Sequence, residues 1–455
     1  MSKSAIPQRA VHGRWVRRRS FGVGTLSVVA ALVLAACGGS SEEGGTATTS
    51  PDSGGSGEPV ELTFWSWMTN IKDVVAIWNN ANPDIHVTVD RLAEGDDLVT
   101  RIITANKAGN LPDLMQAEYQ ALPVLVSNGI VADLSQDVKP IRDSISEGAW
   151  NQVTWNGKTF AVPGDIAPLM MFYREDRFAE LGLTVPTTWK EFAETARSVR
   201  AADPSSYLTS FSPGDTGWFA GLSQQAGADW WSTEGESWKV NIDSEPTQRV
   251  ATFWGDLVAE HAVATNATYS AEWNAALNDG TQLAWVSPVW GAGVIAGIAP
   301  DTAGLWRAAP MPQWSTGQDV TGYWGGSSAA ISAHTKHYKE SMKFLTWLFT
   351  STEATKALVD ISGLYPAAVS GQEYALQTVT PAILKGQDDF YRLAAHAASV
   401  ARGFTWSPNV TATYSTLHDA FSAAIEAGTP LVDALPAIES SSQADLEAQG
   451  YQVAK

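Results

Sequence analysis

Residues 154–174, TWNGKTFAVPGDIAPLMMFYR, guide our interpretation of the whole sequence. The pattern predicts an Asn-Gly turn, a short strand over 159–162, a Pro-Gly break and an apolar strand over 169–173. One acidic residue, Asp165, lies between the two strands with a proline on either side. This arrangement indicates a crossing between two lobes, with Asp165 as a ligand acceptor in the cleft. A loop aspartate that bonds its own backbone is the alternative interpretation.

Length and composition limit the classes of protein. The 455 residues, 44% of them hydrophobic, exceed what one core usually supports, so we expect two domains. The net charge of −19 argues against binding to nucleic acid phosphates and to polyanionic substrates. The chain has 20 Trp, many beside Gly, Ser or Pro. An indole has an apolar face and one N–H donor, which suits a binding surface.

The first 36 residues have the pattern of a signal peptide. They contain six basic residues and no acidic one, and an apolar run over 21–34 that is too short to span a bilayer. The sequence LAAC over 34–37 resembles a bacterial lipoprotein lipobox, and Cys37 is the only cysteine. We therefore expect Cys37 to be the acylated first residue of the mature protein.

A Gly- and Ser-rich segment follows the cysteine. Residues 38–58 contain seven glycines and no large apolar side chain, so no burial could offset the entropy lost on ordering. We interpret residues 37–58 as an acylated cysteine and a flexible tether. The folded part should then lie outside the cell, lipid-anchored to the outer face of the bacterial cell membrane.

The folded part opens with alternating strands and helices. We expect strands over 60–65 and 85–89, helices over 70–80 and 97–107, and a strand that ends near Glu118. This order is typical of an α/β protein with a largely parallel sheet. Ligands bind at the carboxyl ends of such strands, where Trp65, Trp67 and Glu118 fall.

The second half continues with helices and short strands. Thr188 and Glu191 have the spacing of a capping box, so a helix should start there and run to about 202. We expect a Trp-rich loop region next, helices over 246–260 and 270–278, and strands over 282–286 and 329–332. From residue 336 onward the pattern is helical. The loop region contains three tryptophans that could belong to the cleft or the core: Trp218, Trp230 and Trp231.

Several motifs in order resemble the family 1 extracellular solute-binding proteins, the sugar-capturing lipoproteins of ABC importers related to maltose-binding protein. The motifs are FWSW, NPDI, GNLPDL with EY, NGKTFAVPGD, PTTW, SPVWGAG and YWGGSS, within residues 59–370. The resemblance implies a two-lobed, periplasmic-binding-protein-like (type II) fold, in which each lobe is a mixed sheet flanked by helices and hinge crossings join the lobes. It also implies that a sugar is enclosed between the lobes and passed to an ABC permease with its ATPase.

The resemblance places the lobes and the site on this sequence. Lobe 1 should comprise 59–164 plus 319–362, and lobe 2 should comprise 165–318 plus 363–455. The ligand-binding residues should flank the cleft between them: Trp65, Trp67, Glu118, Asp165, Trp290, Trp324, Gly325 and Gly326. Carboxylates accept hydrogen bonds from hydroxyls and indoles stack on the apolar face of a pyranose, so these residue types suit a neutral sugar. We expect no cofactor and no enzymatic activity.

Each candidate residue has a structural alternative. Trp65 and Trp67 share a face of their strand, so at least one could pack in the core, and we favour Trp67 for the ligand. Glu118 could be a solvated loop acid. Trp290 and Trp324 could pack internally. His334 and His337 have i, i+3 spacing, but without clustered acids or cysteines we expect no metal site.

Other functional classes also use aromatic clefts. A secreted glycoside hydrolase or a lectin is the main alternative, since Asp165 and Glu118 could supply a carboxylate pair. The sequence has no Gly-x-Ser-x-Gly, Ser-x-x-Lys or zinc signature. A binder of peptides or oxidised iron is a third class, although an aromatic excess in Trp with only 11 Tyr argues against phenolate ligands for iron.

Overall fold

The structure is a computed structural model that describes residues 58–93, 95–378 and 380–454. These residues belong to one unit, Gly57–Lys455. The predicted signal peptide, Cys37 and nearly all of the tether lie outside the described residues. Among the described residues, no helix combines the length and the apolar composition needed to cross a bilayer.

A five-stranded sheet organises the first half of the unit, in the order β2-β1-β3-β13-β6. Strands β1, β2 and β3 are parallel, and β13 pairs antiparallel with both β3 and β6. The strands are β1 Val60–Trp65, β2 Ile85–Asp90, β3 Leu114–Glu118, β6 Val162–Pro163 and β13 Ser327–Ile331. In β1, Leu62 and Phe64 are buried and their neighbours are less so, as the predicted alternation requires.

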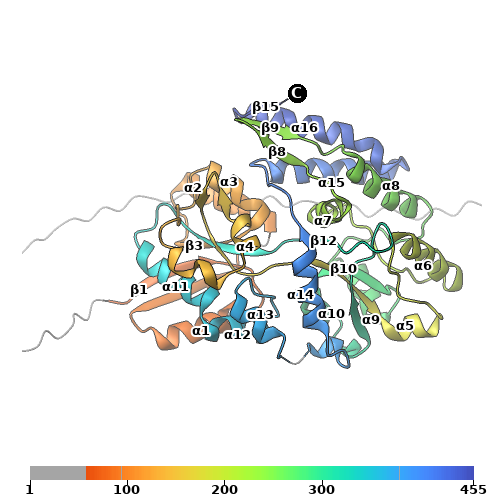
Figure 1. The fold of residues 1–455 in the computed structure, drawn as a ribbon, viewed down its shortest axis with the longest axis horizontal. Helices are drawn as coiled ribbons and strands as arrows, with labels where there is room; N and C mark the ends of the chain where they lie inside the picture. The colour runs from red at the N-terminus through yellow and green to blue at the C-terminus, as the bar shows by residue number, and fades with distance from the viewer. Residues whose placement is uncertain (1–57, 94, 379, 455) are drawn as a thin grey trace, which may run out of the picture. The chain divides into compact units, whose positions relative to one another are not determined.

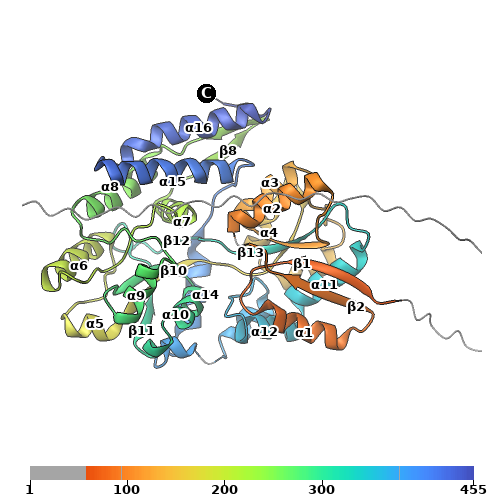
Figure 2. The same cartoon turned by 180° about the vertical axis from the view of Figure 1, so that it is seen from behind.

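Helices lie on both sides of this sheet (Figures 1 and 2). They are α1 Ile71–Ala81, α2 Gly95–Ala108, α3 Leu122–Ser127, α4 Glu147–Gln152, α11 Tyr338–Thr350 and α12 Thr352–Asp360. A two-stranded hairpin follows α4: β4 Thr154–Trp155 and β5 Lys158–Thr159. Asn156 and Gly157 turn this hairpin with positive φ, as the Asn-Gly pattern predicts. The strand expected over 159–162 is instead divided between β5 and β6.

A second, antiparallel sheet has the order β10-β7-β11. Its strands are β7 Leu169–Arg174, β10 Ala284–Pro288 and β11 Trp306–Ala309. The helices near it are α5 Glu175–Glu180, α6 Trp189–Ala202, α7 Thr216–Ala226, α8 Glu245–Ala259, α9 Ala271–Asp279 and α10 Gly291–Ile298. Helix α6 starts with the predicted capping box, in which Thr188 and Glu191 satisfy each other's backbone N–H groups.

Two segments connect the two sheets, and a third segment is bonded to them. The first runs from β6 to β7 and the second from β12 (Thr321–Gly322) to β13, and the third lies between α12 and α13 (Val369–Ala375). Bridges pair Asp165 with Pro366 and Pro168 with Tyr323. These pairings hold the crossing segments side by side between the sheets.

The C-terminal part adds helices and two short strands. These elements are α14 Phe390–Val400, β14 Ala401–Arg402, α15 Val410–Ala427, α16 Leu435–Ala448 and β15 Gln452–Val453. Strand β14 pairs with β12, and β15 joins β9 (Ser237–Val240) and β8 (Trp231–Glu234) in a small sheet. The expectation of helix alone after residue 336 is therefore wrong for β14 and β15. Short 3-10 helices complete the unit: η1 Tyr119–Ala121, η2 Lys139–Ser144, η3 Pro300–Thr302, η4 Ala382–Leu384 and η5 Leu431–Ala434.

Most of the tryptophan excess fills the cores. The fully buried indoles are those of Trp150, Trp189, Trp230, Trp231, Trp254, Trp273 and Trp306. The Trp-rich region around 218 is the helix α7 and not a loop, and Trp218 is buried in it. Trp218, Trp230 and Trp231, which the sequence placed in either the cleft or the core, are thus all buried in the hydrophobic core around α6, α7 and α8.

Candidate functional site

Asp165 lies at the first crossing and is 3% exposed. Its Oδ1 accepts hydrogen bonds from the Ser327 N–H at 3.0 Å and from the Ser327 hydroxyl at 2.5 Å. Burial raises the pKa of Asp165 to about 6, while the two hydrogen bonds from Ser327 oppose this rise. This carboxylate therefore joins two crossing segments, and its role in ligand binding stays a prediction.

Tyr119, directly after Glu118, completes this joint. Its hydroxyl donates to the Asp165 carbonyl at 2.8 Å, and its backbone N–H donates to the Gly326 carbonyl at 3.2 Å. Burial raises the pKa of Tyr119 well above its usual value, so the phenol is neutral at physiological pH. The end of β3 is thus fixed to both crossings.

Gly325 and Gly326 allow close approach at the second crossing. Both have positive φ, +77° and +89°. A Cβ on Gly325 would lie 3.2 Å from Glu118 Oε1 and 3.9 Å from Trp290 Nε1, and one on Gly326 would lie 2.9 Å from Tyr119 Cε2. These positions need glycine because of both conformation and space.

An aromatic pair stands beside Gly325. The rings of Trp290 and Trp324 meet edge to face with centroids 5.0 Å apart, and both contact the buried Trp285. Each of the two rings is only partly buried. The Trp324 backbone N–H donates to the Ala167 carbonyl at 3.1 Å, which joins the backbone of this residue to the first crossing.

The remaining predicted residues lie at the ends of the first-sheet strands. Glu118 Oε2 accepts a hydrogen bond from Gln120 at 2.6 Å. Trp65 and Trp67 are partly buried against the hydrophobic core of the five-stranded sheet. The backbone N–H of Trp67 donates to Gln116 Oε1 at 2.9 Å. Among the described residues, no hydrogen bond or ring contact joins either indole to Trp290 or Trp324. The structure thus brings Glu118, Asp165, Trp290, Trp324, Gly325 and Gly326 together, and a ligand contact of Trp65 and Trp67 stays a prediction.

Sequence reasoning missed a cavity of about 140 Å³ next to Gly325. Its walls come from α4, α7, both crossings and the segment after β14. They include Tyr119, Gln152, Gln224, Tyr323, Gly325 and Trp406. Gly325 was predicted as a site residue and belongs, with Tyr323, to the YWGGSS motif. The other wall residues lie far apart in the sequence and share no local pattern, so only the Trp excess gave a signal for one of them.

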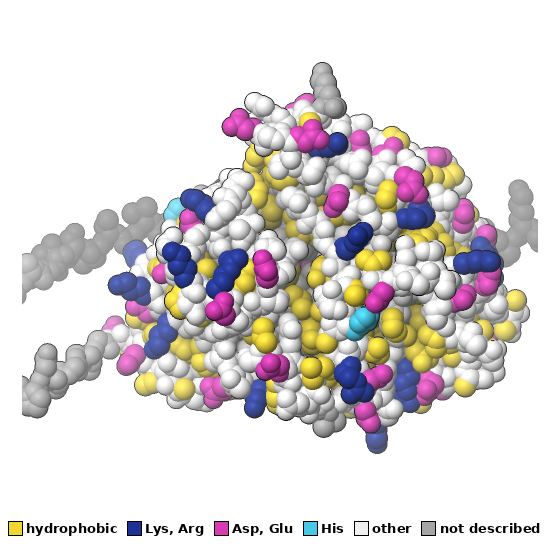
Figure 3. Space-filling view, viewed as in Figure 1, with side chains coloured by type: hydrophobic (Ala, Val, Ile, Leu, Met, Phe, Trp, Pro, Cys, Tyr) yellow, Lys and Arg dark blue, Asp and Glu magenta, His cyan; other side chains and the backbone are white. Residues whose placement is uncertain are grey.

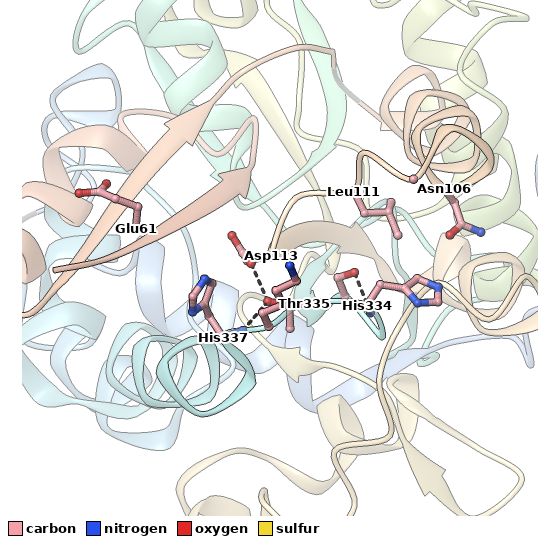
Figure 4. A pocket seen from close by; sticks show the side chains of 10 residues that line it. Glu61, Asn106, Leu111, Asp113, His334, Thr335 and His337 are labelled. Atoms are coloured by element: carbon pink, nitrogen blue, oxygen red, sulfur yellow. Dashed lines mark hydrogen bonds between the residues drawn. The ribbon is translucent and has the colours of Figure 1, made fainter. Parts of the chain in front are cut away.

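A second, larger hollow of about 430 Å³ lies on the first-sheet half (Figure 4). It contains His334 and His337, but their rings lie on opposite sides of Thr335. Asp113 in this hollow already accepts hydrogen bonds from Thr63 and Thr335. Within the described residues, no three His, Cys, Asp or Glu side chains form a group that could hold a metal ion.

The face of the molecule drawn in Figure 3 carries charges of both signs. On the face in Figure 3, acidic and basic side chains lie side by side, with apolar surface between them. Such a face offers no continuous basic stripe to a phosphate backbone. The net charge of −19 agrees with this.

Comparison with known proteins defines the class. The profile of the bacterial extracellular solute-binding proteins matches residues 65–355, and the chain belongs to this family. A lacto-N-biose complex of the galacto-N-biose-/lacto-N-biose I-binding protein of an ABC transporter from Bifidobacterium longum superposes with a TM-score of 0.78. That protein is 27% identical, and the match covers 88% of this chain and 100% of that one. The predicted two-lobed fold and the predicted family are confirmed.

Two curated relatives are similar over most of their length. An arabinooligosaccharide-binding protein of Halalkalibacterium halodurans is 25% identical over 320 residues, which are 67% of this chain and 71% of the relative. A maltooligosaccharide ABC transporter solute-binding lipoprotein of Streptococcus pneumoniae is 25% identical over 366 residues, 78% of this chain and 81% of the relative. Family and relatives are binding proteins.

Proposed function

We propose that this protein captures a sugar or oligosaccharide between its two lobes and delivers it to the membrane subunits of an ABC importer. The lobes are residues 59–164 with 319–362 and residues 165–318 with 363–455. The ligand contacts are Trp65, Trp67, Glu118, Asp165, Trp290, Trp324, Gly325 and Gly326. The protein works outside the cell, held at the outer face of the membrane by acyl groups on Cys37.

One observation carries this proposal. Trp290 and Trp324 form an edge-to-face pair, partly buried, directly beside the positive-φ backbone of Gly325 and the Glu118 carboxylate. An indole offers a flat apolar face to the C–H side of a pyranose, and a carboxylate accepts hydrogen bonds from the sugar hydroxyls. The relatives named for arabinooligosaccharides, maltooligosaccharides and lacto-N-biose support the same ligand class.

The protein binds its ligand without converting it. A glycosidase needs two carboxylates facing one glycosidic bond. Asp165, one of the pair considered, already accepts two hydrogen bonds from Ser327 at the crossing. These contacts suit a structural or binding carboxylate better than an acid or nucleophile.

A ligand screen tests the proposal. Neutral mono- and oligosaccharides are added to the purified mature chain, and the melting temperature is measured. A ligand at a hundredfold excess over its Kd should stabilise the protein by about 2.7 kcal/mol. Reducing ends are then assayed after prolonged incubation with each hit. Absence of any stabilisation by sugars would contradict sugar capture, and release of reducing ends would favour the hydrolase.

A further inference from the structure

The dipeptide Asn-Gly occurs twice in the sequence, and the fold places the two pairs in different settings. Asn128 and Gly129 follow helix α3, whereas Asn156 and Gly157 form the turn of the β4–β5 hairpin. Both asparagines are exposed. Asparagine is a chemically labile residue, and a following glycine leaves its side chain open to attack by the backbone. Because the reacting groups of the two pairs are identical, the fold decides which pair can react.

Asn128 and Gly129 are held by hydrogen bonds at the end of α3. The side-chain amide of Asn128 donates to the Val124 carbonyl at 2.8 Å. The Gly129 N–H donates to the Val126 carbonyl at 3.0 Å. The side chain and the next backbone nitrogen are thus both engaged in the C-terminal turn of a helix, and neither is available for a reaction with the other.

Asn156 and Gly157 lack these restraints. Within the part of the chain that the structure describes, neither the Asn156 side chain nor the Gly157 N–H makes a hydrogen bond to the protein. Both residues are exposed and have positive φ, +50° and +75°. No atom lies within 4 Å of the position that a Cβ on Gly157 would take. Strands β4 and β5 have only two residues each, so the turn can open without breaking a long ladder.

We propose that Asn156 is a site of spontaneous modification, at which the side-chain amide is converted to aspartate and isoaspartate while Asn128 is spared. The Gly157 nitrogen gives its proton to a base in the solvent and attacks Cγ of Asn156. A C–N bond forms, the side-chain nitrogen leaves as ammonia, and a succinimide ring results. Water then opens the ring at one of its two carbonyls, which gives either aspartate or isoaspartate. In isoaspartate the main chain runs through the side-chain carbon atoms.

The isoaspartate changes the hairpin and what the hairpin holds. It lengthens the main chain within the turn, and it adds a negative charge close to Lys158, whose ammonium pairs with Asp133 at 3.2 Å. Trp155 pairs with Lys158 across the unmodified turn. The indole of Trp155 is partly buried against the hydrophobic core around α6, α7 and α8. Since a longer turn cannot keep this pairing, the modification loosens the packing of Trp155 on that core.

The test follows both Asn-Gly pairs in one sample of the mature chain. The protein is incubated at mildly alkaline pH, and peptides are analysed by mass spectrometry after digestion at acidic pH. Each conversion rate is divided by the rate of the same asparagine in denaturant, which removes the effect of its sequence neighbours. The divided rate should be about tenfold higher for Asn156, because a hydrogen-bonded helix end opens rarely. An equal or higher divided rate for Asn128, or no reaction of Asn156 in the folded chain, would overturn the proposal.

Two variants separate the reaction from its consequence. Asn156→Gln should stop the reaction at this position, since the longer side chain would have to close a larger ring. Asn156→Asp carries the new charge on an unaltered main chain. The aged wild-type protein is separated from unreacted protein by anion exchange, and its melting temperature should be lower than that of Asn156→Asp. Equal melting temperatures would contradict the loss of Trp155 packing. None of these measurements needs a sugar, so their outcome is independent of the proposed function.

Discussion

Ser327 donates two hydrogen bonds to a single oxygen of Asp165, one from its backbone at 3.0 Å and one from its hydroxyl at 2.5 Å. The two residues are 162 positions apart and belong to different crossing segments. The crossing segments act as the hinge for any closing motion of the lobes, and the contact between Ser327 and Asp165 joins two of these segments. The Asp165 carboxylate therefore has a structural role, and its contribution to the stability of the protein can be measured separately from any contact with a ligand.

Replacement of Asp165 should separate these two roles. Asp165→Ala leaves both Ser327 donors without their acceptor, whereas Asp165→Asn keeps an oxygen in place. We expect Asp165→Ala to be less stable than Asp165→Asn by about 1 to 3 kcal/mol in chemical denaturation. Titration with the best sugar then tests binding. If Asp165→Asn binds as tightly as the wild type, the predicted ligand contact is wrong and the joint alone explains this residue.

The pH dependence of stability should differ between the wild type and Asp165→Asn. The Asp165 pKa rises from 3.8 to about 6 on folding, so between these values the folded state holds a proton that the unfolded state has lost. The wild type therefore loses stability relative to Asp165→Asn as pH rises from 4 to 7, by up to about 3 kcal/mol. Denaturation at pH 4, 5.5 and 7 measures this difference.

Asp203 provides a control of opposite sign. Hydrogen bonds from Ser205 and Ser206 lower the pKa of Asp203 to about 2, so its contribution to stability is present above pH 4 and is lost as pH falls toward 2. Asp203→Asn should therefore be less stable than the wild type near neutral pH. A parallel pH course for the two variants would contradict the assignment for Asp165.

Alanine at three glycines of positive φ should have three different outcomes. Gly317 has φ +84° and no atom within 4 Å of its missing Cβ, so Gly317→Ala should cost only the conformational strain, about 1 kcal/mol. Gly326→Ala should cost more, because its Cβ meets the Tyr119 ring at 2.9 Å. Gly325→Ala should lie between the two in stability, because its Cβ would lie 3.2 Å from Glu118 Oε1, and it should weaken sugar binding. Unchanged sugar affinity in Gly325→Ala would remove this glycine from the site.

Ligand should shift the two lobes toward a closed arrangement. A sugar that contacts both lobes binds the closed form more tightly and so increases its population. The radius of gyration from small-angle scattering should fall at saturating sugar, and tryptophan fluorescence should change. Trp290→Phe should reduce the fluorescence change. An identical radius with and without ligand would count against closure.

The proposed lipid anchor is tested at Cys37, the only cysteine of the chain. Cys37→Ser should leave the folded unit with the wild-type melting temperature and sugar affinity, because we expect the Gly- and Ser-rich segment 38–58 to act as a tether. Acylation should be lost, and the protein should leave the membrane fraction. Mass spectrometry of the membrane-extracted chain checks this. An acyl mass on the serine variant would disprove the role of the thiol.

Local sequence patterns predicted the elements whose signals are local. The capping box at Thr188 and Glu191 predicted the start of α6, and the alternation over 60–65 predicted β1. Helix α7 was not predicted from the sequence. It is buried on nearly all sides and contains Gly and Ser, so its sequence shows no apolar stripe. Strand β15 pairs with β9 more than 200 positions earlier, and no local pattern reports such a partner.

The residues of the candidate site likewise fall into those that local sequence patterns predicted and those that they did not. Trp290 and Gly325 lie in recognisable motifs and were predicted from the sequence. The structure places them close together, and their contact with a ligand stays a prediction. Gln224 and Trp406 were missed, because they reach the cavity only through the packing of α7 and of the segment after β14. A tryptophan count signals a binding surface but does not show which indoles remain accessible. Trp230 and Trp231 are fully buried, whereas Trp406 lines the cavity beside Gly325.

The position of β13 has a consequence for how the chain acquires its structure during synthesis. This strand, Ser327–Ile331, fills the gap between β3 and β6, both of which end before residue 164. Until about residue 331 has been made, the nascent chain has two strand edges facing an empty position, and the sheet cannot be completed. Contacts between such distant segments form slowly. A long N-terminal portion thus stays incompletely folded while translation proceeds, which is the condition a chain needs if it is to be threaded through a membrane before it folds.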